Sequence, residues 1–446
     1  MGKRKTMRAV ATVGAVLIAV AACGSDDPET PAGGGEPEPE QKQVNVYGSD
    51  GNMGNALGDN FTEDGALEGM SGTTPLTELA EDFRDRLLAD DSALVDFNYA
   101  AESYDAVLLV ALAAETARTN DATTYAPFIN SLTTGGEKCI DWATCVAIVQ
   151  AGGDADYDGQ SGPLAFTDAG EPAAASFGVL TFGADNAIDE SLTEFVLAGD
   201  EANATTTEPP TAPDPTSAPT GGPLTIGTLL PQTGSLAFLG PPEESGVRIA
   251  VAEINEAGGA LGQPVGLVEG DSGDTSTDTA NTTTDRLLQA GVNAIIGAAS
   301  SGVSQTVIDK ITGAGVVMFS PANTSDIFTD YDDKGLYFRT APPDVLQARA
   351  LADILIAEGN TSVGILALND PYGTGLAENI QENLISDGIG EDAIQVVIYD
   401  PNATSFRTEV ADMVEFNPDA IIVIGFDESS IVITEMNAQG IGPAGP

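Results

Sequence analysis

Long apolar runs alternate with amphipathic segments through the second half of the chain. The runs are rich in Val and Ile and almost unbroken, as expected for strands of a parallel sheet that is covered on both faces. The predicted strands are residues 224–231, 264–271, 292–300, 316–321, 336–342, 362–370, 394–400 and 419–427. The predicted helices are residues 244–259, 279–291, 304–315, 345–359, 375–388 and 405–418, and several end at Gly or Pro. Repeated strand–helix units predict an α/β fold with parallel sheets and right-handed crossovers.

Three of the predicted turns between a strand and a helix carry polar or aromatic side chains. They present Ser300 and Ser301, then Asn323 and Thr324, and then Tyr372. Ligands of open α/β sheets bind beyond the carboxyl ends of the strands, and the free amides of a helix start suit a carboxylate. The same residue types cap helices in ordinary proteins. A binding site and simple capping both remain open from this pattern.

Two polar tracts interrupt the chain. Residues 24–42 are rich in Pro, Gly and Glu, and residues 203–222 are rich in Pro and Thr, so neither is expected to pack into a core. The second tract is predicted to be a linker between segments 43–202 and 223–446. The stretch at residues 339–344 also breaks the alternation, and it predicts a passage between two sheets.

The first residues predict export. Basic residues are followed by an apolar run and then by small Ala21 and Ala22 before Cys23, the pattern of a bacterial lipoprotein signal peptide. The apolar run is short for a membrane span. We therefore expect residues 1–22 to be removed, Cys23 to carry lipid, and residues 23–42 to tether a domain to the extracytoplasmic face of the cell membrane. An ordinary secreted protein with a free cysteine is the alternative.

The amino-acid composition excludes several classes of function. The formal net charge is −52, which argues against binding to nucleic acid. The sequence contains no histidine, so it excludes Ser-His-Asp and Cys-His catalysis and His-ligated zinc. An enzyme would have to use carboxylates, Lys or Tyr. Cys139 and Cys145 are predicted to form a disulfide, because paired cysteines in an exported chain usually do so and a metal would need more ligands.

One acidic stretch has a calcium-loop pattern. Asp154, Asp156, Asp158 and Gly159 follow the opening of an EF-hand loop, whereas the twelfth position is Ala165 and not the expected Glu. A calcium loop and an ordinary polar turn therefore both remain open. We predict no metal site and no cofactor elsewhere.

Several longer motifs together resemble the leucine/isoleucine/valine-binding type of solute-binding protein that feeds ABC importers. They are IGTLLPQTGSLAFLG, GVRIAVAEINEAGG, IIGAASS, FSPANTS, FRTAPPD, NDPYGTGLAE and NPDAIIVIGFD in the second segment, and VNVYGSDG, AAESYDAVLLVALAAE and YDGQSGPLAFTDAGEPAAASFGVLTF in the first. The resemblance implies the type I periplasmic binding protein fold, with two Rossmann-like lobes joined by three hinge crossings. The ligand lies between the lobes, which close around it.

The order of the two segments is inverted relative to that family. The part that resembles the family's first half is residues 223–446, and the part that resembles its second half is residues 43–202. The resemblance therefore implies a circular permutation, although an error of gene assembly would give the same order of segments in the sequence. It places residues 223–340 with about 76–162 in one lobe. The other lobe takes residues 341–446, 43–75 and about 163–200.

The resemblance also implies residue roles. Ser301 and Thr324 would hold a ligand carboxylate, and the Ala322 carbonyl and the Asp50 carboxylate would face its ammonium group. Tyr372 would form an aromatic wall. Leu239 stands where the family has an aromatic residue, Phe426 replaces a tyrosine, and Gly273 and Ser300 replace a cysteine pair. The remaining candidate contacts, beside these, are Asn323 and Phe238.

The resemblance, together with the predicted lipid anchor and the absence of histidine, implies a lipid-anchored, monomeric solute-binding protein and not an enzyme. It would capture an amino acid or analogue, branched-chain or related, and deliver it to the permease subunits of an ABC importer. A sensory or amide-binding receptor on the same fold is the alternative, followed by a carboxylate-dependent exported enzyme. The departures at Leu239 and Phe426 leave the ligand open.

Overall fold

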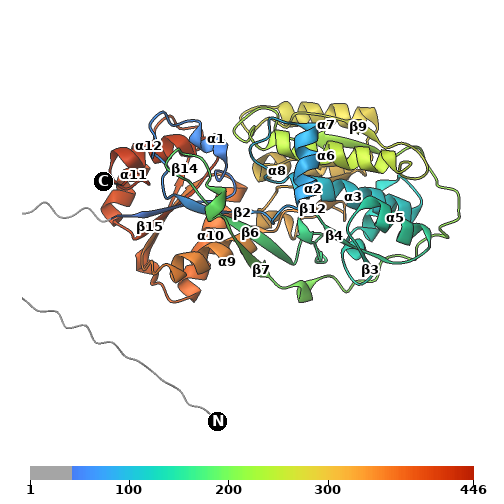
Figure 1. Cartoon of the computed structure of the whole chain (residues 1–446), viewed down its shortest axis with the longest axis horizontal. Coiled ribbons are helices and arrows are strands. Elements are labelled where there is room, and N and C mark those ends of the chain that lie inside the picture. Colours follow the sequence, from blue (N-terminus) through green and yellow to red (C-terminus); the bar gives the residue numbers. More distant parts are fainter. Residues whose placement is uncertain (1–42, 446) are drawn as a thin grey trace, which may run out of the picture. The chain divides into compact units, whose positions relative to one another are not determined.

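The computed structural model describes residues 43–445, and the predicted signal peptide, Cys23 and the tether lie outside them. Two main sheets form within this part of the chain, together with a small three-stranded sheet. We call each main sheet with its helices a lobe. Figure 1 shows that strands from the blue start of the sequence colour scale lie beside strands from its red end.

The larger sheet has seven strands drawn from both segments. Its order is β14 (Ile394–Tyr399), β13 (Val363–Leu368), β15 (Ala420–Ile424), β1 (Asn45–Gly48), β2 (Ser71–Pro75), β6 (Ala174–Thr181) and β7 (Glu194–Gly199). Strands β14 to β2 in this order are parallel, and β6 and β7 are antiparallel to their neighbours. The pairing of Asn45 with Ala420 brings the two ends of the described chain into one sheet.

The second sheet is entirely parallel. Its order is β12 (Tyr337–Arg339), β11 (Val317–Ser320), β10 (Ala294–Gly297), β8 (Thr225–Leu229) and β9 (Gly266–Val268). The small sheet consists of β3 (Glu137–Cys139), β4 (Ala155–Gly159) and β5 (Gly162–Pro163). The central strands β10 and β11 are buried along their whole length, which explains their unbroken apolar sequence.

Helices cover both main sheets. The seven-stranded sheet carries α9 (Asp344–Ala357), α10 (Pro371–Ser386), α11 (Arg407–Phe416), α12 (Ser429–Ala438) and the short α1 (Asn55–Gly58). The five-stranded sheet carries α3 (Ala100–Ala117), α6 (Gly240–Glu256), α7 (Thr279–Ala290), α8 (Ser301–Gly313) and, farther out, α2 (Glu81–Asp90), α4 (Ala122–Tyr125) and α5 (Trp142–Gln150). Helix α3 is buried on nearly every side, in keeping with its apolar sequence.

The predicted α/β fold with parallel sheets is confirmed, and each strand and helix predicted in the second segment is present. The largest differences at helix starts are in α6, which begins at Gly240, and α10, which begins at Pro371, each earlier than its apolar pattern predicts. Both first turns contain proline, whose fixed φ and missing N–H suit a helix start. The sequence pattern did not predict α12.

The chain passes between the two lobes at four places. Three are short: Leu76–Ala80 between β2 and α2, Leu164–Ala173 between β5 and β6, and Thr340–Pro343 between β12 and α9. We call these three segments the crossings. The fourth is the tract from Asp200 to Leu224 between β7 and β8, which contains the predicted linker. Arg118 donates two hydrogen bonds to the Ser217 carbonyl, and Thr119 forms a β-bridge with Thr220. Part of this tract therefore contacts the lobe that contains α3.

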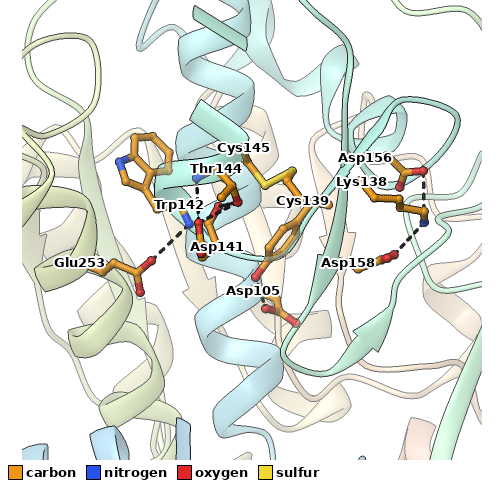
Figure 2. Close-up of a disulfide and its surroundings, with 11 residues drawn as sticks. Asp105, Lys138, Cys139, Asp141, Trp142, Thr144, Cys145, Asp156, Asp158 and Glu253 are labelled. Carbon is orange, nitrogen blue, oxygen red and sulfur yellow. Dashed lines mark hydrogen bonds and ion pairs between the residues drawn. A yellow bond between two sulfur atoms is a disulfide. The ribbon is translucent and has the colours of Figure 1, made fainter. Parts of the chain in front are cut away.

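A disulfide joins β3 to α5, as predicted. Cys139 and Cys145 form it, and Asp141 caps α5 between them by accepting a hydrogen bond from Thr144 at 2.7 Å (Figure 2). The Trp142 backbone amide donates a hydrogen bond to the Glu253 carboxylate on α6 at 3.2 Å. The bridge thus ties the small sheet and α5 together on the outer side of α3.

The acidic stretch with the calcium-loop pattern forms β4 and its turn into β5. The Lys138 ammonium lies 3.2 Å from Asp156 and 2.8 Å from Asp158, so a protein cation pairs with both carboxylates (Figure 2). Over residues 43–445 no group of acidic or cysteine side chains has a metal-binding arrangement. Within the same residues we find no helix with the length and apolar character needed to cross a bilayer.

Candidate ligand-binding cleft

Loops from both lobes enclose a cavity with an empty volume of about 270 Å³, which we call the cleft cavity. Its lining follows the strand ends of both main sheets and the starts of α3, α8 and α10, the position expected for a ligand in an open α/β fold. The lining residues are Asp50, Gly51, Tyr99, Leu236, Leu239, Ala299, Ser300, Ser301, Ala322, Thr324, Tyr372 and Phe426.

Eight of the ten residues predicted to contact ligand line the cleft cavity. They come from distant parts of the chain, with Asp50 in the first segment and the others in the second. Two lie elsewhere. Asn323 is fully buried behind the wall, where its side chain donates to the Ala299 carbonyl at 2.8 Å and accepts from the Tyr337 hydroxyl at 3.1 Å. Phe238 lines a neighbouring hollow with Gly51 and Phe426.

Asp50 gives the cleft cavity its acidic side. It follows β1, and its carboxylate accepts hydrogen bonds from the hydroxyls of Tyr99 and Tyr372, both at 2.8 Å. Burial raises the pKa of this carboxyl, and the two hydroxyls oppose that rise by stabilising the ionised form. The two donors also fix the carboxylate in one orientation, which prepares it to receive a positive group.

Tyr372 stands at the start of α10, after the helix-capping Asp370. Its ring stacks on Phe426, with centroids 5.7 Å apart and planes inclined by 7°. Its hydroxyl lies 2.6 Å from the Ser49 hydroxyl and accepts from the Gly51 amide at 3.3 Å. The aromatic wall and the Asp50 carboxylate are therefore held by one connected set of hydrogen bonds.

The opposite side of the cleft cavity is built by the turn into α8 and the turn after β11. Ser300 caps α8 by accepting from the Val303 amide at 3.3 Å, and Ser301 is the first residue of the helix. The Ser325 amide donates to the Ser301 hydroxyl at 3.4 Å, and the Thr324 carbonyl accepts from the Asp344 amide at 2.7 Å. A helix start with hydroxyl groups favours a negatively charged partner.

No lysine or arginine is among the residues of the described chain that line the cleft cavity. Arg339, in the nearby strand β12, is fully buried and bonded to Glu171, with its Nε 2.9 Å from the carboxylate. Asp344 is also fully buried, and burial together with the Asp50 charge raises its pKa well above the usual range. The electrostatic character of the site thus favours a ligand with a positive group. A negative group on the ligand would have to accept hydrogen bonds from the backbone amides at the helix start.

Sequence reasoning missed Tyr99, Leu236, Gly51 and Ala299 as lining residues. Gly51, Leu236 and Ala299 lie within the family-like motifs, and Tyr99 lies directly before one of them. Tyr99 precedes α3 with a left-handed φ of 60°, and it reaches the cleft because α3 starts there. That position depends on how α3 packs in the lobe, and no local pattern in the sequence reports it.

The sequence profile of the periplasmic binding protein family matches residues 223–445, half of the chain. The Leu/Ile/Val-binding protein BraC3 of Rhizobium johnstonii is 32% identical over 202 residues, which are 43% of this chain and 54% of that protein. Leu/Ile/Val-binding protein homolog 8 of Brucella abortus is 29% identical over 236 residues, 49% of this chain and 56% of that protein. The chain thus spans a little over half the length of these curated relatives.

Solved structures of similar chains include two leucine or branched-chain binding proteins. LivK of Thermotoga maritima has a TM-score of 0.44 at 24% identity, covering 49% of this chain and 61% of that one. LivJ of Streptococcus pneumoniae, in complex with isoleucine, has a TM-score of 0.43 at 28% identity, covering 49% and 62%. Because the family profile covers half of the chain, this protein belongs to the periplasmic binding protein family, as the resemblance in its sequence predicts.

Proposed function

We propose that this protein captures a small amino acid-like zwitterion in the cleft cavity and delivers it to the permease of an ABC importer. The observation that carries the proposal is the pairing of two chemically opposite walls. Asp50, oriented by Tyr99 and Tyr372, and the helix start at Ser301 both line the cleft cavity. A zwitterion needs both kinds of partner, because an unpaired charge in a closed cleft costs several kcal/mol.

In this proposal each end of the ligand has its own partners. The ligand ammonium pairs with Asp50 and with the Ala322 carbonyl. The ligand carboxylate accepts hydrogen bonds from the Ser301 and Thr324 hydroxyls and from amides at the start of α8. Ser300 supports this wall as the helix cap, and Asn323 and Phe238 act by holding loops and not by direct contact.

The side-chain end of the proposed ligand is apolar. Leu236, Leu239, Ala299 and the Phe426 ring form that part of the lining. This supports a branched-chain or related amino acid, in line with the Leu/Ile/Val-binding names of the relatives. A receptor for an amide on the same fold is the second candidate, since Asp50 can also accept hydrogen bonds from an amide.

We place the protein at the extracytoplasmic face of the cell membrane, held by lipid on Cys23 and acting as a monomer. The proposal rests on the sequence before residue 43 and on the family. We propose no catalytic role, because the relatives are binding proteins.

The circular permutation is part of the proposal, with the lobe boundaries stated from the sequence. Strand β15 leads into α12, and the parallel neighbour of β15 is β1 at the other end of the described chain. In an unpermuted chain α12 would be the crossover helix of an ordinary β15–α12–β1 unit. In the permuted chain, the tract from Asp200 to Leu224 would connect the two positions that are the free termini in other members of the family.

Ligand-induced stabilisation tests the function. The purified chain is melted with each of the twenty amino acids, and with their amides, at fixed pH and salt. A true ligand at a hundredfold excess over its Kd adds about 2.7 kcal/mol to the unfolding free energy. Calorimetry then checks the best ligand on Thr324→Ala, with exposed Thr434→Ala on α12 as the matched control. The proposal fails if no compound stabilises the chain, or if Thr324→Ala binds as tightly as the control.

A further inference from the structure

A second and larger cavity lies where the three crossings meet. Its empty volume is about 1,030 Å³, and we call it the hinge cavity. Each crossing contributes to its lining: Thr77 from the first, Leu164 and Pro172 from the second, and Thr340 and Pro342 from the third. It shares no lining residue with the cleft cavity. The hinge cavity is therefore a separate space, formed by the segments that bend when lobes of this kind close.

One buried acid lines the hinge cavity. Glu102 is 5% exposed and is the third residue of α3. Its carboxyl accepts from its own backbone N–H, and within residues 43–445 no lysine or arginine pairs with it. The Thr340 hydroxyl donates to the Glu102 carbonyl at 2.9 Å, which holds this residue against the third crossing.

The surroundings of Glu102 are negative or neutral. Burial and, to a smaller extent, the Asp105 carboxylate on the same helix raise its pKa to about 8. Other titratable groups near it are Tyr99, directly before α3, and Glu243 on α6, and Asp200 and Glu201 line the same cavity. None of these groups can supply the positive charge that an ionised, buried Glu102 needs.

We propose that the hinge cavity is a second ligand site and that it takes a small alkylammonium ion. The ammonium group pairs with the Glu102 carboxylate, and the alkyl chain lies against apolar lining such as Pro75, Leu164 and Pro172. An amphiphilic cation satisfies both features of the cavity, whereas an inorganic cation leaves the apolar lining unfilled and a neutral molecule leaves the acid unpaired.

The probe for this site is n-propylammonium chloride, titrated into the whole chain by calorimetry with no amino acid present. n-Propanol serves as the neutral isostere, and sodium chloride at equal ionic strength serves as the salt control. We expect saturable binding of one n-propylammonium per chain and none of n-propanol. Because the ion binds ionised Glu102, its affinity should be at least about tenfold higher at pH 8.5 than at pH 6.5.

Variants locate the binding. Glu102→Gln should abolish it, whereas the matched Glu201→Gln, at an exposed acid of the same cavity, should retain it. Thr77→Trp fills the cavity from a partly exposed position and should also abolish binding, which covers the case that Glu102→Gln does not fold. The proposal is overturned if n-propylammonium does not bind, if n-propanol binds equally well, or if Thr77→Trp binds like the wild type. These outcomes do not depend on what the cleft cavity binds.

Discussion

Asp50 is a buried carboxyl group whose hydrogen-bond donors are tyrosine hydroxyls. This arrangement is unfavourable for the ionised form, because burial outweighs the hydrogen-bond donors and the pKa is raised. A ligand ammonium would supply the missing charge. The residue is thus one at which binding and stability should respond to mutation in opposite directions.

Asp50→Asn should weaken binding of the zwitterion at least about a hundredfold, because breaking a buried ion pair costs about 3–5 kcal/mol. The same change should leave the empty protein as stable as before, or more stable, since it removes a buried acid. Calorimetry gives the affinity, and urea unfolding gives the stability. Exposed Asp412→Asn on α11 is the matched control. Equal affinities in the two variants would contradict the assigned role.

Tyr99→Phe tests the residue that the sequence did not reveal. Losing a hydrogen bond to a charged group costs about 1.5–3 kcal/mol, so affinity should fall roughly tenfold to a hundredfold. The pKa of Asp50 should rise further without this donor. Since the ammonium binds the ionised carboxylate, affinity should decline as the pH falls, and the decline should begin at a higher pH in Tyr99→Phe. Overlapping pH profiles for variant and wild type would rule out the coupling.

At the residue scale, turn chemistry and the family resemblance were enough to bring Ser301, Thr324 and Tyr372 to one cavity. Asn323 shows the limit of that reasoning. It stands between two lining residues, yet the chain turns its amide toward the Ala299 carbonyl behind the wall. The direction of a loop side chain depends on its neighbours in space, which a local pattern does not contain.

Among the elements, α5 and the small sheet depend on a covalent link. The Cys139–Cys145 disulfide closes a short loop, and its removal should lower the unfolding free energy by about 2 kcal/mol through the entropy of the unfolded chain. The double variant Cys139→Ala, Cys145→Ala in urea unfolding measures this loss. Neither cysteine lines the cleft cavity, so ligand affinity should stay unchanged. A loss of affinity equal to that of Asp50→Asn would show that the bridge supports the cleft.

The existence of helices and strands with a strong apolar pattern could be predicted from the sequence. The residues at which these elements begin were less predictable. Strands β10 and β13 are continuous apolar runs and appear where expected. Helix α10 begins on a proline and α6 has prolines in its first turn, and an apolar pattern does not register either of them. Helix α12 was missed although buried Val432, Ile433 and Met436 have helical spacing, because the β-branched run around them is equally typical of a strand.

For the whole molecule, buried acids set the response to pH. Besides Asp50, burial raises the pKa of Glu102 to about 8, of Glu428 to about 7, and of Asp105 and Asp370 to about 6. Each of these groups keeps its proton in the folded protein at a pH where the unfolded chain has lost it. Stability therefore falls as the pH rises through this range.

Urea unfolding at fixed ionic strength should accordingly show a higher unfolding free energy at pH 5 than at pH 8. The slope is about −1.4 kcal/mol per pH unit for each proton that the folded state retains. Glu243→Gln removes one such group, since Glu243 is fully buried and its pKa is well raised, so the slope should become shallower. A stability that increases from pH 5 to pH 8 would contradict this account.

The pairing of the two segments in the large sheet has no local signal in the sequence. Strand β1 lies between β15 and β2 at the centre of the large sheet, so residues of β1 and β15 that are 375 positions apart pair in one parallel ladder. Such a pairing depends on the fold as a whole and leaves no mark at either strand. The resemblance of both segments to one family made it predictable in outline.

The interleaving of the two segments in the seven-stranded sheet has a consequence for limited proteolysis. The tract from Asp200 to Leu224 is largely exposed and rich in proline, so a protease can reach it. A nick there would release neither fragment, because the backbone hydrogen bonds between β15 and β1 and the shared core would still hold them together. The cleaved protein should elute at the size of the intact one, and two separately expressed halves should complement each other into a working receptor.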